Sequence, residues 1–250
     1  MSETFRAFRI HGDERGNHRA GIETLALDVT DEPSRQRAVR IVESRFGPVY
    51  ALVYGSGAPQ YGAVEEVELA SVRRALEASV LGFARMCQLV LPGMRRTRGG
   101  RIVVTVPEGG AQGAGMQHAM GRALACVADA LRDEVRAYGV HVATVLGAPL
   151  DATLAARALG WLPHAADTSP YRALHEQLAR MLAHAARGGE EKGPAVDEVA
   201  AMVLRAAADP RPDARYEIGV RGRLLWLLRG IVQTRAGGRG ADGGGSEMPS

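Results

Sequence analysis

Residues 101–147 read RIVVTVPEGGAQGAGMQHAMGRALACVADALRDEVRAYGVHVATVLG, and this stretch decides the fold. It begins and ends with β-branched runs, at 101–106 and 140–147, which are typical of buried strands. The segment from about 116 to 138 has apolar residues at helical spacing and predicts one long helix. Two strands joined through a helix are typical of a parallel sheet covered by helices. The stretch therefore predicts an α/β fold.

The alternation of strands and helices continues on both sides of this stretch. The remaining expected elements are strands at 5–10, 23–30, 50–57 and 215–220, a helix from Asp31 to Phe46 capped by Thr30 or Asp31, a helix from 67 to about 96 that breaks or ends near Pro92 and Gly93, mostly helical structure over 148–186, and a helix at 196–208. Such an order predicts a Rossmann-like, doubly wound parallel sheet flanked by helices.

Composition limits the organisation and the partners of the chain. With 250 residues, 46% of them hydrophobic, we expect a single domain over residues 1–234 and a disordered glycine-rich tail over 235–250. The formal charge of +3 comes from 31 basic and 28 acidic residues spread along helices, and aromatic residues make up 5%. A nucleic-acid partner is therefore not expected.

The sequence also bears on location and metal binding. Cys87 and Cys126 lie in apolar helical stretches and are expected to be buried thiols in a reducing compartment. We expect a cytoplasmic protein with no membrane partner, because no signal-peptide pattern and no apolar run of about 18 residues is recognised. No metal site is expected, because the histidines show no ligand-like spacing; they stand at 11, 18, 141, 164, 175 and 184, besides His118.

The order of the segments resembles the short-chain dehydrogenase/reductase family, most closely its steroid and retinol dehydrogenase branch. Four stretches carry the resemblance: LDVTDE (27–32), LVYGSGAPQYG (52–62), LPGM (91–94) and GGRIVVT (99–105). They fall in the family's order with roughly its spacing, and the resemblance covers about residues 5–230.

The resemblance implies where the family's catalytic residues should stand. Its tyrosine, the general acid, falls at Gln117, and the lysine that lowers the tyrosine pKa and holds the nicotinamide ribose falls at Gly121. Its catalytic serine falls at about Pro107 and its relay asparagine at Ser79. Two further motifs are replaced: Asn-Ala-Gly by Gly55, Ser56 and Gly57, and Pro-Gly by Gly147 and Ala148. The usual proton-transfer residues are therefore missing.

The cofactor site is also expected to be incomplete. The stretch FRAFRI (5–10) best matches the family's second strand, so its first strand, glycine-rich loop and first helix have no counterpart. Only 22 residues precede the strand that starts at 23, fewer than the roughly 30 residues of a βαβ unit. No cofactor is expected. Asp28, at the position of an adenine-contacting aspartate, is at most a vestigial contact, and a helix-cap or turn role is favoured.

Four polar residues remain as candidates for a different chemistry. Gln117 can orient a carbonyl without titrating, and His118 can act as acid or base near neutral pH. Glu108 follows a strand at the edge where α/β sheets bind ligands, and Ser79 replaces the relay residue. For His118 and Glu108, an exposed position outside any site is the favoured interpretation.

Three functions stay open. The first is a cofactor-independent cyclase, isomerase or dehydratase for a hydrophobic carbonyl or polyketide-like compound, held under a lid at about 148–190 that retains Trp161, Leu162, Tyr171 and Leu174. The second is a non-catalytic partner, as a homodimer or paired with an intact family member through helices 67–91 and 116–137. The third is residual NAD(P)-dependent oxidoreductase activity. Whether the chain is an enzyme is therefore open.

Overall fold

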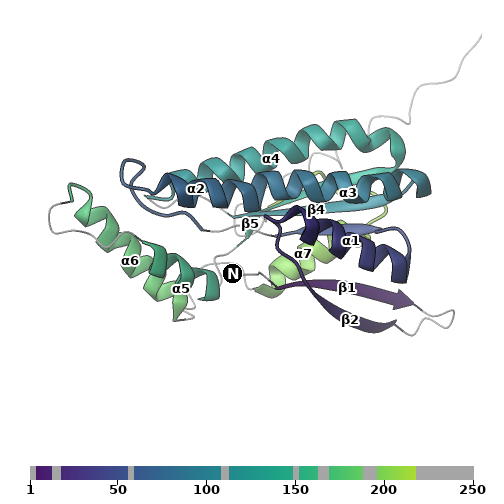
Figure 1. The fold of residues 1–250 in the computed structure, drawn as a ribbon, viewed down its shortest axis with the longest axis horizontal. Coiled ribbons are helices and arrows are strands. Elements are labelled where there is room, and N and C mark those ends of the chain that lie inside the picture. Colours follow the sequence, from purple (N-terminus) through teal and green to yellow (C-terminus); the bar gives the residue numbers. More distant parts are fainter. Residues whose placement is uncertain are drawn as a thin grey trace, which may run out of the picture.

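The fold is built around a parallel sheet, seen in a computed structural model that describes residues 4–12, 18–55, 59–107, 113–148, 152–162, 169–187 and 196–217 (Figure 1). In chain order the elements are β1 (Thr4–Gly12), β2 (His18–Ala26), α1 (Glu32–Phe46), β3 (Ala51–Tyr54), α2 (Leu69–Leu76), a π-helical turn η1 (Glu77–Leu81), α3 (Gly82–Thr97), β4 (Gly100–Pro107), α4 (Gly115–Val135), a 3-10 turn η2 (Arg136–Tyr138), β5 (Val140–Ala148), α5 (Ala152–Trp161), α6 (Arg172–Ala186), α7 (Val196–Ala208) and β6 (Arg215–Glu217).

The four-stranded sheet has the order β3-β4-β5-β6, and each described pair of neighbours is parallel. Val103 of β4 pairs with Ala143 of β5, and Val145 of β5 pairs with Tyr216 of β6. This confirms the parallel sheet expected from the strand–helix–strand pattern.

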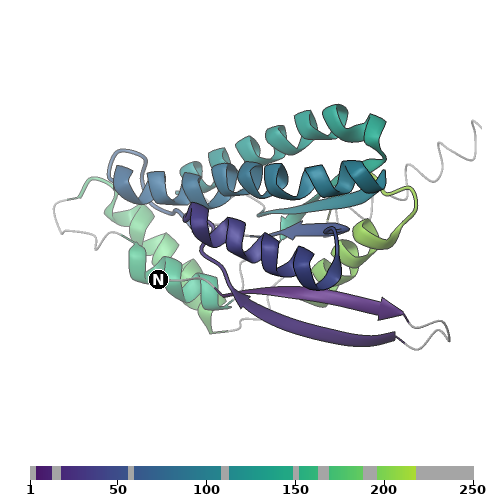
Figure 2. The ribbon, with the colours of Figure 1, turned by 45° about the vertical axis from the view of Figure 1, so that its right-hand side comes forward.

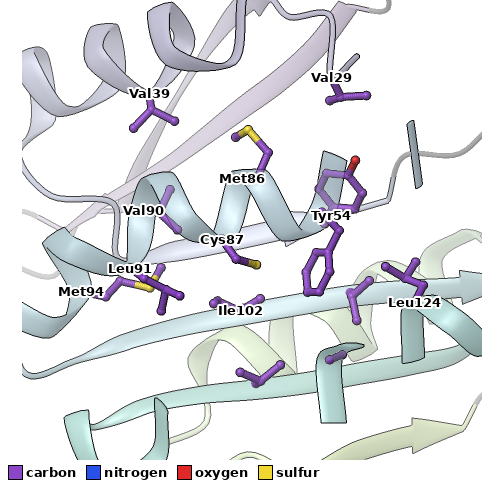
Figure 3. Packing of buried hydrophobic residues seen from close by; sticks show 14 of the residues in the cluster. Val29, Val39, Tyr54, Met86, Cys87, Val90, Leu91, Met94, Ile102 and Leu124 are labelled. Atoms are coloured by element: carbon purple, nitrogen blue, oxygen red, sulfur yellow. The ribbon is translucent and has the colours of Figure 1, made fainter. Parts of the chain in front are cut away.

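Helices cover both faces of this sheet. Ile102 and Val104 of β4 belong to the cluster formed with α3 and α4, and Figure 3 shows Ile102 below Cys87 and Met86 of α3. Val103, between them in sequence, packs instead with Ala206 of α7. Because successive strand side chains point to opposite faces, one β-branched run supplies both halves of the core.

The N-terminal strands differ from the expectation. β1 and β2 form an antiparallel hairpin, a separate two-stranded sheet in which Thr4 pairs with Ala26 (Figure 2). The placement of 5–10 and 23–30 in the parallel sheet was therefore wrong. Parallel pairing of consecutive strands needs a crossover of about a dozen residues or more, whereas β1 ends at Gly12 and β2 begins at His18.

Helix α1 begins where the sequence predicts. The Asp31 carboxylate accepts a hydrogen bond from the Ser34 backbone N–H at 2.9 Å, which confirms Asp31 as the N-cap. α1 lies between the hairpin and α3 in both ribbon views, and Val39 of α1 joins the same apolar cluster as Val90 of α3.

The segment Leu69–Thr97 is helical throughout, so the expected break at Pro92 and Gly93 was wrong. Pro92 has no backbone N–H, so the carbonyl four residues earlier has no helical donor. Pro92 is exposed, and water can hydrate that carbonyl. Within the described residues, Leu69–Thr97 is a helix that is long and apolar enough to cross a membrane, judged by its length and its mean hydropathy of 1.2. The expectation that no segment approaches a span was therefore too strict, although its inner face packs on the sheet as a core helix does.

Helices α5 and α6 confirm the mostly helical structure expected over 148–186. We keep the name lid for this pair, whose role as a substrate lid stays a prediction. Ala158 and Leu162 of the α5 region pack against Leu178 and Leu182 of α6 in their own apolar cluster. α7 and β6 lie where 196–208 and 215–220 are expected, and the structure describes β6 as far as Glu217. The tail over 235–250 lies outside the described residues.

The two cysteines lie in different environments. Cys87 is buried, and burial raises the pKa of its thiol to about 12. Cys126 is exposed, so its expected burial was wrong. The neighbouring Leu124 and Ala128 occupy the face of α4 that packs on the sheet, which leaves Cys126 on the opposite side.

Candidate functional site

The carboxyl ends of β3, β4 and β5 meet at one edge of the sheet, where open α/β sheets bind their ligands. The described chain reaches this edge at Gly55, at Pro107 and at Gly115, the first residue of α4. Ser56, Gly57 and Glu108 lie outside the described residues, so no geometry is assigned to them. The candidate site consists of this edge and the first turns of α4.

Gln117 is half-buried on the first turn of α4. Its side-chain oxygen Oε1 accepts a hydrogen bond from the backbone N–H of Gln60 at 2.9 Å. The amide oxygen therefore holds the segment that follows β3 against α4. This oxygen is already engaged with the protein itself.

His118 is exposed on the next position of α4. Its backbone N–H donates to the Ala114 carbonyl at 2.8 Å, as in an ordinary first helical turn. The exposed position agrees with the interpretation that this side chain faces away from the site.

Ser79 is buried in the π-helical turn η1, and its hydroxyl donates to the Ala75 carbonyl one turn earlier at 2.6 Å. The Tyr54 hydroxyl donates to the Ala78 carbonyl in the same turn. A Cβ on Gly82 would lie 2.5 Å from the Tyr54 oxygen, so a glycine is needed there. Single π-helical turns are frequent at functional sites, but the Ser79 hydroxyl is used within its own helix.

The candidate polar side chains do not form one network in the part of the chain that the structure describes. Gln117 bonds to Gln60, Ser79 bonds to Ala75, and His118 is exposed. Asp28 accepts hydrogen bonds from the Thr30 side chain and backbone, which lower the pKa of its carboxyl. This supports the turn role for Asp28.

His175 was not identified as a site residue from the sequence. It is 2% exposed on α6, and its Nε2 lies 3.5 Å from the Ala63 backbone N–H donor and 3.4 Å from Glu66 Oε2. Its Nδ1 is buried with no hydrogen-bond partner among the described residues. The helical spacing of His175, Leu178 and Leu182 was the available signal, because it places all three on one inner face.

The segment 59–66 connects α4 to the lid. The Gly62 backbone N–H donates to the Gly113 carbonyl at 2.8 Å, just before α4. On the lid side, the Ser169 hydroxyl donates to Glu66 at 2.7 Å and the Tyr171 hydroxyl donates to Glu65 at 2.6 Å. The lid is therefore held near the candidate site by polar contacts as well as apolar ones.

The turn between β2 and α1 offers no cradle for the pyrophosphate of a pyridine dinucleotide. A pyrophosphate cradle needs free backbone N–H groups at a helix N-terminus after a glycine-rich turn. The turn between β2 and α1 instead carries Asp28 and Asp31, and the Asp31 carboxylate already occupies the N-terminus of α1. On α4, Gly121 is buried and offers no ammonium group. No group of three or more metal-ligating side chains occurs in the described ranges.

Comparison with known proteins identifies related chains. A sequence model of the family described as short chain dehydrogenase matches residues 9–161. Human 17-beta-hydroxysteroid dehydrogenase type 1 is 31% identical over 212 residues, which cover 83% of this chain and 63% of that protein. The uncharacterized oxidoreductase YusZ of Bacillus subtilis is 27% identical over 219 residues, which cover 84% of this chain and 75% of that protein.

A solved structure shows the same fold. The crystal structure of a short-chain dehydrogenase from Streptomyces avermitilis matches with a TM-score of 0.60 at 23% identity, over 84% of this chain and 75% of that one. The chain spans less than two thirds of the length of the human relative.

Proposed function

Because this chain belongs to the short-chain dehydrogenase/reductase family, as its match over residues 9–161 shows, we propose that it acts as a non-catalytic subunit that pairs with a family member. One observation carries the proposal: at the proton-transfer position stands Gln117, whose oxygen accepts from Gln60. An amide does not titrate near neutral pH and cannot act as a general acid. A positioned general acid is worth about 10²- to 10⁴-fold in rate, so its loss removes most of the family's chemistry.

The cofactor-independent enzyme has less support. Enclosure and orientation accelerate a reaction only when several polar groups converge on one substrate. Gln117 and Ser79 are instead satisfied by separate partners, and His118 is exposed. The relatives are named as dehydrogenases or oxidoreductases, which gives no support for a cyclase or a dehydratase.

Exposed apolar side chains on two neighbouring helices support the pairing. On the segment Leu69–Thr97, three leucines are exposed: Leu69, Leu76 and Leu81. On α4 the exposed small residues are Ala119, Cys126 and Ala130. We propose this surface, formed by α2, η1 and α4 and called the α2/α4 face, as the contact with a second copy or with an intact relative.

Residual oxidoreductase activity is the second candidate. The names of the relatives favour it, since 17-beta-hydroxysteroid dehydrogenase type 1 and YusZ are both named for redox activity. It requires that the protein bind a reduced nicotinamide cofactor despite Gln117 and the buried Gly121.

A fluorescence titration with NADH and NADPH separates the two candidates. For the non-catalytic subunit we expect no saturable binding in the low micromolar range and no turnover of a hydrophobic ketone. The double variant Gln117→Tyr with Gly121→Lys is the companion variant, and it too should remain inactive if the chain does not bind the cofactor. Tight binding with steady ketone reduction by the unaltered protein would establish the oxidoreductase instead.

A further inference from the structure

A shallow hollow of about 540 Å³ lies at the end of α3, away from the candidate site. α3 ends at Thr97 and leads directly into the amino end of β4, whereas the candidate site lies at the carboxyl ends of the strands. The hollow is lined by six residues of α3, its C-terminal junction and η2: Pro92, Arg95, Arg96, Arg98, Ala137 and Tyr138. We call it the Arg95–Tyr138 hollow.

All charged residues that line this hollow are arginines. Within the described ranges, none of Arg95, Arg96 and Arg98 forms an ion pair with a carboxylate. The Arg95 guanidinium lies 5.8 Å from the centroid of the Tyr138 ring. The Glu43 carboxylate lies beside Gly93, and its Oε1 would be 3.0 Å from a Cβ added to Gly93. Within the described residues, Glu43 forms no ion pair with Arg95, Arg96 or Arg98. Arg96 Nη2 lies 3.8 Å from the same Cβ position on Gly93, so Glu43 is near Arg96 without forming an ion pair. Three arginines therefore give the hollow an excess of positive charge.

These arginines are not needed to cap α3. The last carbonyls of a helix require donors, and basic side chains often supply them. Here the Met94 carbonyl accepts from the Gly99 backbone N–H at 3.1 Å and from the Thr97 hydroxyl at 3.1 Å. The Arg95 carbonyl accepts from the Arg98 backbone N–H at 3.2 Å. The guanidinium groups are therefore available to an external anion.

We propose that the Arg95–Tyr138 hollow binds a phosphate monoester whose organic part is apolar. Guanidinium groups match phosphate oxygens in bidentate geometry, and clusters of them are the usual phosphate recognition device. The exposed ring of Tyr138 and the side chain of Pro92 form an apolar wall for the organic part. The phosphate can come from a free metabolite or from a lipid headgroup.

This inference does not depend on the proposed function, because no lining residue belongs to the candidate site. Isothermal titration with phenyl phosphate and with inorganic phosphate tests it on the full chain. We expect both to bind, phenyl phosphate more tightly. The double variant Arg96→Ala with Arg98→Ala should weaken both by roughly tenfold or more, since each charge-assisted contact is worth about that factor. Tyr138→Leu should weaken phenyl phosphate only.

A matched control removes two exposed arginines elsewhere, Arg73 on α2 and Arg180 on α6, by Arg73→Ala with Arg180→Ala. This control should bind like the unaltered protein, and thermal unfolding shows that each variant is folded. Flotation with phosphatidic acid vesicles identifies the source: binding to vesicles alone, lost in the Arg96/Arg98 variant, assigns a lipid headgroup. Absence of binding to all three probes, or equal losses in the control, would overturn the proposal.

Discussion

Gly113 joins three parts of the molecule at a single residue. Its φ of +78° lies in the left-handed region, and its carbonyl accepts from the Gly62 N–H at 2.8 Å. A Cβ at this position would stand 2.4 Å from Leu178 Cδ1 of the lid. Both the conformation and the close approach therefore require glycine.

Replacement of Gly113 by alanine should lower the free energy of unfolding by about 1–3 kcal/mol, from backbone strain and overpacking against Leu178. Urea unfolding followed by circular dichroism measures this. Gly160→Ala in α5 is the matched control, because no atom lies within 4 Å of its added Cβ. Alanine there should be neutral or raise stability by up to about 1 kcal/mol. Equal losses for both variants would contradict the role assigned to Gly113.

The candidate site was only partly predictable at the scale of residues. The replacement of the tyrosine and lysine by Gln117 and Gly121 follows from a local match of sequence. The hydrogen bond from Gln60 to Gln117 spans 57 positions, and no local pattern encodes it. His175 meets Ala63 across 112 positions, so its role between lid and site was missed for the same reason.

At the scale of elements, Glu32 connects α1 to α3. Its carboxylate accepts from Arg85 Nε at 2.9 Å on α3 and from Gln36 Nε2 at 2.7 Å on α1. The hydrogen bonds from Arg85, followed by that from Gln36, lower the pKa of Glu32 to about 2. The ionised carboxylate is therefore favoured in the folded protein.

This pKa sets the direction of an acid dependence. A folded-state pKa of about 2, below the ordinary 4.5, stabilises the fold above pH 4.5, and that contribution is lost as the pH falls toward 2. The melting temperature of the protein should exceed that of Glu32→Gln near neutral pH, and the difference should shrink between pH 4.5 and 2. Glu68→Gln is the control, because its pair with Arg74 is 3.9 Å long and both side chains are exposed. A difference independent of pH would argue against this connection.

Most elements followed from their sequence periods. The helix at 196–208 and the strands around 101–106 and 140–147 appear within a few residues of their expected bounds. The hairpin of β1 and β2 was missed because periodicity identifies a strand without identifying its partner. The helix through Pro92 continued because tertiary packing of its apolar face outweighs one missing hydrogen bond.

At the scale of the whole molecule, the proposed pairing places the exposed apolar residues of the α2/α4 face in a contact with a second chain. Leu81 is 54% exposed on this face, and Leu204 is 55% exposed on α7, at the other side of the sheet. A contact through the α2/α4 face should bury Leu81 and leave Leu204 in water.

Leu81→Glu should therefore convert the associated protein to a monomer, because a desolvated carboxylate opposes the contact. Light scattering coupled to size-exclusion chromatography measures the mass of each species. Leu204→Glu, matched in exposure and chemistry, should leave the mass unchanged. If the unaltered protein associates and Leu81→Glu has no effect on its mass, the contact lies elsewhere. If the unaltered protein is a monomer and also fails to pair with an intact relative, the proposed subunit role is excluded.

The sequence by itself determined the parallel sheet, the order of its helices and the family, because each depends on a local period or a local match. Only the tertiary structure decided the hairpin pairing of β1 with β2, the engagement of Gln117 by Gln60, the burial of His175 and the contact of Arg95 with the Tyr138 ring. These arise from contacts between segments distant in the chain, and they depend on how the packed elements are placed in space.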